Sequence, residues 1–337
     1  MSALIFLCVA AGLWNPTPSG GIVLGPETVR TIAFEDEFRL TAAGKGAEGI
    51  ARGETTFALP SDEPGQRILA GPDDLPTGAD VRLDLHRNRL AVLSLAPFDP
   101  AAGLRTAWSV RVALADREHK VRPEALLGRT AIPPDVLSRY LFLDGRHETG
   151  DGELARVAAE AARASRDPAD LAFRLNELVR ERVTYVRDGR WDPAPIVWRT
   201  GRGSCSEYHF LYATLCRLAG LPCRFVGATA WRGKDGEATY EDTVYHRWSE
   251  VYLAGYGWFP VDVSRNDGED GEPVNRAFGR TSAALLILSR GEGGASDAMG
   301  VQYVARSQTY DANGRPTDSG GLRSDRAIRW TKAPTTP

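Results

Sequence analysis

The fold is decided by a stretch that begins GRGSCSEY at residues 201–208 and ends at Asp262. After Ser206 the apolar residues recur at intervals of three and four, which predicts a buried helix. Gly220 supplies a stop signal for that helix, and Pro222 follows shortly after it. The residues of the predicted apolar face are Phe210, Leu211, Thr214, Leu215 and Leu218.

The second part of the stretch reads as strands. Residues 224–231 are predicted to form one strand, and residues 248–253 and 258–263 a hairpin. His246 lies at the start of the first hairpin strand, and Asp262 lies on the second. The chain order is therefore a Cys at a helix start, followed by a His and an Asp on neighbouring strands.

These three residue types suit nucleophilic catalysis by a thiol. A cysteine attacks as its thiolate, and an ordinary pKa near about 8.5 leaves little thiolate at neutral pH. The N-terminus of a helix favours an anion at Cys205, and an imidazolium from His246 favours it further. Asp262 is placed to accept from the other ring nitrogen and to orient the ring. Gly201 and Gly203 allow a sharp turn that leaves the sulfur open to a substrate carbonyl.

Each residue also has a plain structural interpretation. A free Cys at the head of a buried helix behaves as a small hydrophobe, a single His satisfies local hydrogen bonds, and an Asp ends a strand. Taken one at a time, these interpretations are the stronger ones. Their joint occurrence, with glycines before the Cys and a helix after it, favours a thiol site formed by Cys205, His246 and Asp262.

The stretch resembles the core of the transglutaminase-like superfamily, and the likeness extends over residues 199–264. It is carried by the order and spacing of the segments RGSCSE (202–207), LAGLPCR (218–224), HRWSEVY (246–252) and GWFPVD (257–262). The family includes animal transglutaminases, peptide N-glycanases and many secreted bacterial proteins. The resemblance implies a papain-like α+β core, with Cys205 as nucleophile, His246 as general base and acid, and Asp262 as the orienting carboxylate.

The chain also departs from the family pattern. Arg247 stands where the family often has Ala, and its bulk is expected to restrict or bind substrate. Nothing matches the Ca²⁺-binding apparatus of the animal enzymes, and the zinc-binding CxxC pairs of the peptide N-glycanases are absent from the sequence. We therefore expect no cofactor and no metal, and we do not expect deglycosylation.

A second set of expectations concerns residues around the nucleophile. The backbone N–H of Cys205 is one oxyanion donor by geometry, and Trp198 ranks first for the other, ahead of Trp191 and Tyr185. Glu207 is a candidate helix cap. Cys216 and Cys223 flank the Gly220 turn, where two buried thiols are expected and a disulfide is the alternative in an exported protein.

The N-terminal part of the chain has a different, period-two pattern. Short runs rich in Val, Leu, Thr and Phe alternate with Gly-, Pro- and Asp-containing turns, which predicts an antiparallel β-sandwich over residues 22–132. The runs are residues 28–40, 54–59, 81–85, 89–95 and 108–114. His86 and His119 lie on or beside these strands and are interpreted as structural residues.

The fold class is therefore α+β, with the sandwich followed by a transglutaminase-like catalytic domain over residues 133–310. That domain opens with helices at residues 153–165 and 170–183, the second preceded by an Asp167-Pro168 capping pair. Residues 311–337 are interpreted as a C-terminal tail that is loosely ordered near its end.

Composition excludes some partners and favours export. The net charge is −3 and the arginines are scattered, so neither nucleic acid nor an anionic membrane is expected as a partner. Residues 1–21 are interpreted as a signal peptide or anchor, because residues 1–13 are apolar yet too short to span a bilayer. The mature chain is thus expected to be periplasmic or secreted, without a membrane span.

The leading interpretation is an exported thiol enzyme that acts on peptide or protein amide bonds through a thioester acyl-enzyme. Water would make it a peptidase or amidase, and an amine would make it a transglutaminase, with hydrolysis slightly favoured. The alternative is a non-catalytic binding or envelope scaffold module with the same fold. An arylamine acetyltransferase shares the triad logic but needs a cofactor site that the sequence does not show. The oligomeric state is left open.

Overall fold

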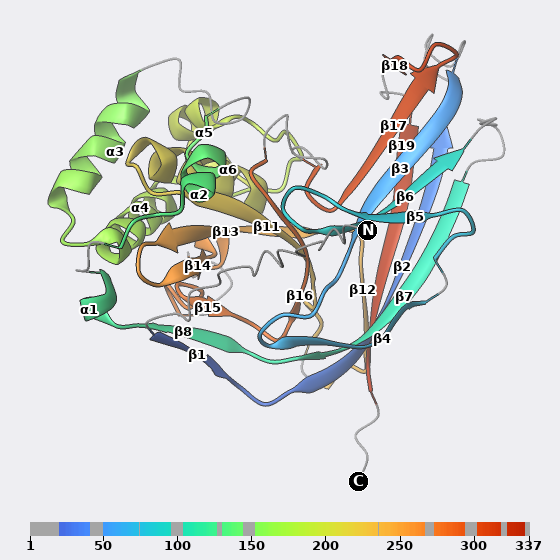
Figure 1. Ribbon diagram of the computed structural model, residues 1–337, viewed down its shortest axis with the longest axis horizontal. Helices are drawn as coiled ribbons and strands as arrows, with labels where there is room; N and C mark the ends of the chain where they lie inside the picture. Colours follow the sequence, from blue (N-terminus) through green and yellow to red (C-terminus); the bar gives the residue numbers. More distant parts are fainter. Residues whose placement is uncertain are drawn as a thin grey trace, which may run out of the picture.

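The structure is a computed structural model that describes residues 20–40, 50–73, 75–95, 104–126, 130–143, 152–234, 236–266, 273–293, 302–317 and 322–333. Helices gather on one side of the molecule and long strands on the other (Figure 1). The fold is α+β, as the sequence predicts. Residues 1–19 of the expected signal peptide or anchor (residues 1–21) lie outside the described residues, and residues 20 and 21 belong to β1 (Gly20–Leu24).

Two five-stranded antiparallel sheets form the sandwich. The first has the order β12-β19-β2-β7-β4 and the second β18-β17-β3-β6-β5. The strands of the first are β12 (Thr239–Asp242), β19 (Leu322–Lys332), β2 (Thr28–Leu40), β7 (Leu104–Leu114) and β4 (Gln66–Asp73). Those of the second are β18 (Pro316–Thr317), β17 (Ala305–Asp311), β3 (Ile50–Leu59), β6 (Arg89–Leu95) and β5 (Asp80–Leu83).

The two sheets enclose an apolar core between their inner faces. Trp108 on β7 stacks on Phe34 of β2 with ring centroids 4.0 Å apart, and it also meets Phe57 of the opposite sheet at 5.7 Å. Ile328 and Trp330 of β19 are fully buried in the same core. Alternation of apolar and polar residues along each strand is what allows one face to be buried.

The C-terminal strands correct the prediction of a tail over residues 311–337. β19 pairs with β2 along eleven register positions, from Leu322 opposite Leu40 to Lys332 opposite Arg30. β17 pairs with β3 in the other sheet. The sandwich is thus built from N-terminal strands, from C-terminal strands and from β12 between them. β19 joins it because a strand with an inward Ile328 and Trp330 gains more from burial than from remaining in solvent.

The other half of the molecule is a four-stranded antiparallel sheet covered by helices. Its order is β14-β13-β11-β16, with β14 (Gly257–Val261), β13 (His246–Leu253), β11 (Cys223–Ala230) and β16 (Leu285–Gly291). The helices are α2 (Pro134–Tyr140), α3 (Gly152–Ala164), α4 (Pro168–Arg182), α5 (Ala194–Thr200) and α6 (Cys205–Leu218). Asp167 caps α4 by accepting from the Ala169 and Asp170 amides, both at 2.9 Å.

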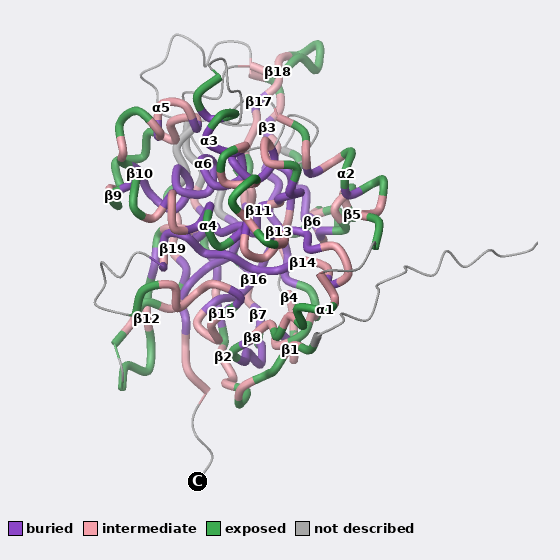
Figure 2. The backbone as a smooth tube through the Cα atoms, turned by 90° about the vertical axis from the view of Figure 1, so that its left-hand side faces the viewer, coloured by how far each residue is buried: buried purple, intermediate pink, exposed green. Residues whose placement is uncertain are grey.

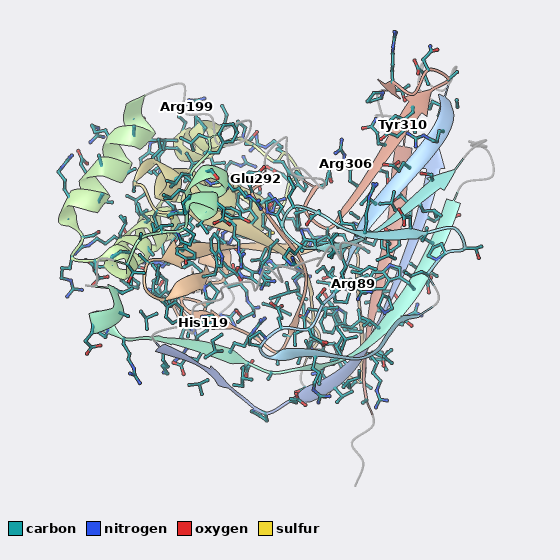
Figure 3. The ribbon with its side chains drawn as sticks, in the orientation of Figure 1. Arg89, His119, Arg199, Glu292, Arg306 and Tyr310 are labelled. Atoms are coloured by element: carbon teal, nitrogen blue, oxygen red, sulfur yellow. The ribbon has the colours of Figure 1, made fainter. Side chains whose placement is uncertain are left out.

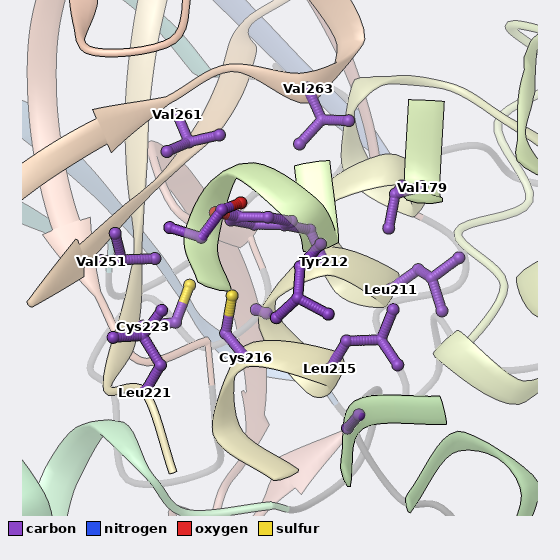
Figure 4. Close-up of a cluster of buried hydrophobic side chains, with 14 of the residues drawn as sticks. Val179, Leu211, Tyr212, Leu215, Cys216, Leu221, Cys223, Val251, Val261 and Val263 are labelled. Atoms are coloured by element: carbon purple, nitrogen blue, oxygen red, sulfur yellow. The ribbon is translucent and has the colours of Figure 1, made fainter. Parts of the chain in front are cut away.

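α6 is the central element of this half, and its residues Cys205 to Arg217 are buried. Leu211, Tyr212 and Leu215 pack against Val179 of α4 and against the strand residues shown in Figure 4. Burial on all sides explains why the helix shows apolar residues around most of its circumference. Figure 2 shows the buried backbone concentrated in α6 and the neighbouring strands.

Smaller elements join the two halves. β8 (Arg117–Val121) pairs with β1 and with β15 (Arg280–Thr281), and α1 (Pro123–Leu126) follows it. His119 of β8 hydrogen-bonds Tyr256 of the β13–β14 turn at 2.8 Å (its position is labelled in Figure 3), and His86 hydrogen-bonds Tyr140 of α2 at 2.8 Å. Both histidines are therefore structural contacts between the halves, as the sequence predicts.

Charged residues also join the halves. Glu250 on β13 is buried between Arg224 and Arg290, at 2.6 and 3.2 Å, and Arg290 continues to Glu63 of the sandwich at 2.5 Å. No described helix is long and apolar enough to cross a membrane.

Candidate active site

The candidate nucleophile lies at the first position of α6, after a tightly built N-terminus. Glu207 Oε2 accepts from the Ser204 amide at 2.9 Å and from the Ser204 hydroxyl at 2.6 Å. Glu207 Oε1 accepts from the Asp192 amide at 3.2 Å. Glu207 therefore caps the helix start and ties it to the preceding loop, which holds the adjacent Cys205 in place.

The two glycines before Cys205 have different roles. Gly201 ends α5 with φ of 64°, a left-handed conformation that favours glycine. Gly203 is required for a close approach, since a Cβ there would lie 2.2 Å from Cβ of Glu207. Gly203 also lies on β10 (Arg202–Gly203), which pairs in parallel with β9 (Thr184–Tyr185). The glycines thus allow the chain to pass directly over the capping carboxylate.

The structure brings Cys205, His246 and Asp262 together. His246 Nε2 lies 2.6 Å from Asp262 Oδ2, and the His246 ring also hydrogen-bonds the Cys205 thiol. Because Nε2 is bonded to Asp262, Nδ1 is the ring nitrogen that is left to bond the Cys205 sulfur. Asp262 follows β14 directly and begins the 3-10 helix η2 (Val263–Arg265). Cys205 comes from α6, His246 from β13 and Asp262 from the position directly after β14, where the sequence predicts that the strand continues to residue 263.

The site favours a thiolate and an imidazolium. Burial raises the pKa of the Cys205 thiol, but the hydrogen bond and charge of His246, together with the Arg247 backbone N–H, outweigh burial and lower it. Burial lowers the pKa of His246, but the Asp262 carboxylate and the thiol raise it to about 9. Burial raises the pKa of Asp262, yet its two histidine partners hold it well below its ordinary value.

Asp262 has a second set of partners that the sequence analysis missed. Its Oδ1 accepts from the Ser264 hydroxyl at 2.9 Å and lies 3.4 Å from Nε2 of His209. The other nitrogen of His209 contacts the Ser249 hydroxyl at 2.9 Å. His209 is four residues after Cys205 and so lies on the same face of α6, a spacing that could have identified it.

Arg247, next to His246, lies among four aromatic rings. Its guanidinium carbon is 3.8 Å from the Tyr303 ring centroid and 5.3 Å from that of Trp191, and it also lies over Phe210 and Phe225. Arg247 is only 1% exposed. The expected substrate contact is therefore replaced by a packing role, in which a buried cation holds aromatic residues in place.

A cleft of about 750 Å³ gives access to Cys205. Its residues come from both halves of the molecule, since Tyr185 and Trp191 lie in the helical half and Gln308 and Arg326 lie on sandwich strands. Its volume lies in the range of small-molecule and peptide sites. The sandwich thus contributes one wall of the candidate site.

The structure does not bring Trp198 to this cleft. Trp198 is on α5, where its carbonyl accepts from Arg182 Nε at 2.8 Å and its ring lies under the same guanidinium. It lines a different cavity, beside Phe173 and Arg182. Tyr185 and Trp191, which ranked below it, both line the Cys205 cleft. Residues 189–202 contain Pro and Trp and are predicted from the sequence to form a loop that leads to Cys205. α5 forms there instead, and Trp198 lies away from the cleft.

Cys216 and Cys223 are free buried thiols, as expected, and they hydrogen-bond one another. Among the described residues, no group of three His, Cys, Asp or Glu side chains could hold a metal ion.

The fold is similar to that of a solved structure. A protein from Cytophaga hutchinsonii, described as a candidate cysteine protease, superposes with a TM-score of 0.64 at 14% identity over 94% of both chains. The periplasmic domain of TgpA from Pseudomonas aeruginosa gives a TM-score of 0.37 at 17% identity, covering 73% of this chain and 93% of that one. Red sea bream transglutaminase gives 0.32 at 12% identity, covering 66% and 46%.

At 14% identity, the likeness to the Cytophaga hutchinsonii protein shows a shared fold. Nothing is concluded from the two structures with TM-scores below 0.5. A search of curated proteins gave no match. Residues 155–263, which run from α3 to the start of η2 and include all three candidate triad residues, match the family described as the transglutaminase-like superfamily. The part of the chain from α3 to the start of η2 therefore matches the transglutaminase-like superfamily.

Proposed function

We propose that the protein is a thiol enzyme that cleaves or transfers peptide or protein amide bonds. The observation that carries the proposal is the linked set Cys205–His246–Asp262, with 2.6 Å between His246 Nε2 and Asp262 Oδ2, at the head of α6. The Cys205 thiolate attacks the carbonyl carbon of the scissile amide, and His246 donates its proton to the leaving amine. The product of this step is a thioester acyl-enzyme.

The acyl-enzyme is resolved by a second nucleophile. His246, now neutral, accepts a proton from water or from an amine as that nucleophile attacks the thioester carbonyl, and the Cys205 thiolate leaves. Oxyanion stabilisation comes from the backbone N–H of Cys205, with Tyr185 or Trp191 as the side-chain candidates in the cleft. Hydrolysis is favoured over transfer, because the cleft is open to solvent and supplies water directly.

The test is a paired assay on a glutamine-containing casein with wild type, Cys205→Ala and a fold-matched control, Cys216→Ala. Ammonia release, incorporation of a fluorescent primary amine and peptide fragments by mass spectrometry are followed together. Fragments or ammonia that depend on Cys205 support hydrolysis, and amine incorporation supports transfer. Equal signals from wild type and Cys205→Ala would contradict the proposal and favour a binding module.

A further inference from the structure

One strand of the sandwich lies edge-on to the Cys205 cleft. Four consecutive residues of β17, residues 305–308, line the cleft. Alternate side chains of a strand point to opposite faces of its sheet, so a cleft bounded by the face of β17 would be lined by every second residue. β17 therefore presents its edge, with its backbone groups, to the cleft. Figure 1 shows this strand on the side of the sandwich nearest the helices.

This edge is covered only toward the end of the strand. β17 lies between β3 and β18 in its sheet. Its register with β3 extends from Ala305 to Asp311, whereas β18 pairs only with Thr309 and Tyr310. Among the residues that the structure describes, no strand pairs with residues 305–308 on the side opposite β3. A short piece of unpaired sheet edge thus borders the cleft of the candidate nucleophile.

A hydrogen bond at the start of the strand shows which backbone groups point away from β3. The Ala58 amide donates to the Val304 carbonyl at 2.8 Å, one step beyond the register pair of Ala305 and Phe57. In an antiparallel pair, positions that bond the neighbouring strand alternate with positions whose N–H and C=O point the other way. The even-numbered residues therefore bond β3, whereas the N–H and C=O groups of Ala305 and Ser307 point toward the open edge.

The other end of the strand agrees with this alternation. The Asp311 amide donates to the Arg315 carbonyl at 3.0 Å, and Thr309 lies opposite Thr317 in the same register. The odd-numbered positions of β17 therefore face β18, and the same side of the strand is open where β18 ends. Residues 305 and 307 are both partly exposed. Unpaired edge groups of this kind are the template to which a further strand adds.

The open edge begins beside the nucleophile. Burial and the nearby Cys205 charge both raise the pKa of Tyr303, which lies two residues before Ala305. The ring centroids of Tyr303 and Trp191 are 6.1 Å apart, and both residues line the cleft together with Cys205. A segment that pairs with the open edge therefore lies in the same cleft as the thiol.

We propose that the substrate is an extended peptide segment that binds by adding a strand to the open edge of β17, and that this pairing presents one of its amide bonds to Cys205. The outward N–H and C=O groups of Ala305 and Ser307 bond the peptide backbone. The substrate class is therefore protein segments that can become extended, such as disordered segments and chain termini. The inference rests on the proposed function for the reaction, but it concerns backbone recognition and is measured as binding.

The first experiment detects the pairing from the side of the peptide. Peptides from a peptic digest of casein are captured on immobilised Cys205→Ala protein and identified by mass spectrometry. The tightest binder is then synthesised with a single backbone N-methyl group at each position in turn, and affinities are measured by fluorescence anisotropy. N-methylation removes one backbone donor and leaves the side chains unchanged.

The open edge has two outward residues, so two peptide donors are expected to matter. At two positions separated by one residue, N-methylation is expected to weaken binding by about tenfold, and at the residue between them it is expected to have little effect. Capture of no peptide would overturn the inference. An N-methyl profile without this alternation would also overturn it.

The second experiment removes a donor from the protein. Ser307→Pro, made in the Cys205→Ala protein, deletes the outward N–H of residue 307, and proline is tolerated at edge positions of this kind. Ser307→Ala keeps the N–H and controls for loss of the hydroxyl. Val81→Pro is the matched proline control, because β5 is the other edge of the same sheet. The Asp84 amide bonds the Asn88 carbonyl at 3.1 Å, so the alternation along β5 points the Val81 N–H outward as well.

Ser307→Pro is expected to weaken binding of the captured peptide by about tenfold, whereas Ser307→Ala and Val81→Pro are expected to match their parent protein. Equal affinity in all of these proteins would overturn the inference. A dimer in solution that Ser307→Pro converts to a monomer would also overturn it, because the edge would then pair with a second copy of the chain. An unreactive Cys205 in wild type would overturn the proposed function and leave these binding results unchanged.

Discussion

The guanidinium carbon of Arg247 lies 3.8 Å from the ring centroid of Tyr303. Arg247 directly follows His246 on β13, whereas Tyr303 belongs to the segment that leads into β17 of the sandwich. Tyr303 and Trp191 both have positive φ angles, 53° and 52°, so each is held in an uncommon backbone conformation beside this cation. Through Tyr303 and Trp191, Arg247 therefore links β13, the strand that carries His246, to both walls of the cleft.

Replacing Arg247 with Met is expected to weaken thiolate formation at Cys205. The buried positive charge of Arg247 lowers the pKa of the thiol, and its side chain spaces the Trp191 and Tyr303 rings. The rate of iodoacetamide alkylation at pH 6 is expected to fall, because a smaller fraction of the thiol is then ionised at that pH. Arg247→Lys should retain more reactivity, and a pH profile unchanged in both variants would contradict this role.

His209 is expected to act as a positioning residue through Asp262. His209→Ala leaves the Ser264 hydroxyl as the remaining side-chain partner of Asp262 Oδ1 described above, so Asp262 holds the His246 ring less firmly. We expect kcat to fall on the order of tenfold with KM little changed, compared with roughly 10⁴-fold for Asp262→Ala. The pH above which activity declines should change as well. A loss confined to thermal stability would instead indicate a purely structural residue.

Activity is expected to decline above pH 9. The Asp262 carboxylate and the Cys205 thiol raise the pKa of His246 from 6.5 to about 9, so the proton needed by the leaving amine is present below that pH and lost above it. Measuring kcat/KM from pH 5 to 10.5 should show this limb. In Asp262→Asn the alkaline decline of kcat/KM should move toward pH 6.5. A decline that stays near pH 9 would show that another group causes it.

Glu250 is expected to stabilise the folded protein in a pH-dependent way. Burial raises the pKa of its carboxyl, but Arg224 and Arg290 outweigh burial and lower it. A lowered folded-state pKa gives stability that is present above the unfolded value of 4.5 and lost as the pH falls below it. Glu250→Gln should therefore cost about 3–5 kcal/mol of unfolding free energy at pH 7.

Urea denaturation measures the free energy of unfolding. The difference in this free energy between Glu250→Gln and wild type should narrow below pH 4.5. Glu181→Gln is the matched control, since Glu181 lies at the surface with 67% of its side chain exposed, against 9% for Glu250. Its expected effect is below about 1 kcal/mol. A Glu250→Gln effect as small as the control, or one that is constant with pH, would contradict the assignment.

The proximity of the candidate triad residues could be predicted from the sequence because its signals are local. The helix start, the Gly220 stop and the β13–β14 hairpin all lie between residues 201 and 262, so periodicity and caps are sufficient to place Cys205, His246 and Asp262. His209 escaped the prediction because a buried His is usually structural. Its importance depends on Asp262, which meets it only in the folded chain.

The sandwich was harder to predict because its pairing is non-local. β19 takes its place through β2, at the other end of the chain, and nothing within residues 322–332 indicates that partner. β4 was missed because Gly71-Pro72 resembles a turn, although a proline is tolerated on an edge strand.

α5 was missed for a similar reason. Pro193 and Pro195 suggested a loop, yet Pro193 is the N-cap and Pro195 lies in the first turn, where a missing N–H costs nothing. The helix then carries Trp198 toward Arg182 and away from the cleft. The second oxyanion donor therefore could not be predicted from the order of residues alone.

The most direct test of the central claim is the rate of iodoacetamide labelling of Cys205 at pH 6, in wild type and His246→Ala. Cys216 serves as an internal reference, because burial raises the pKa of its thiol well above the ordinary value. We predict that Cys205 is labelled rapidly in wild type and at least about tenfold more slowly in His246→Ala. Cys216 is predicted to remain unlabelled in both proteins. Equal labelling of Cys205 with and without His246 would contradict an activated nucleophile at this site.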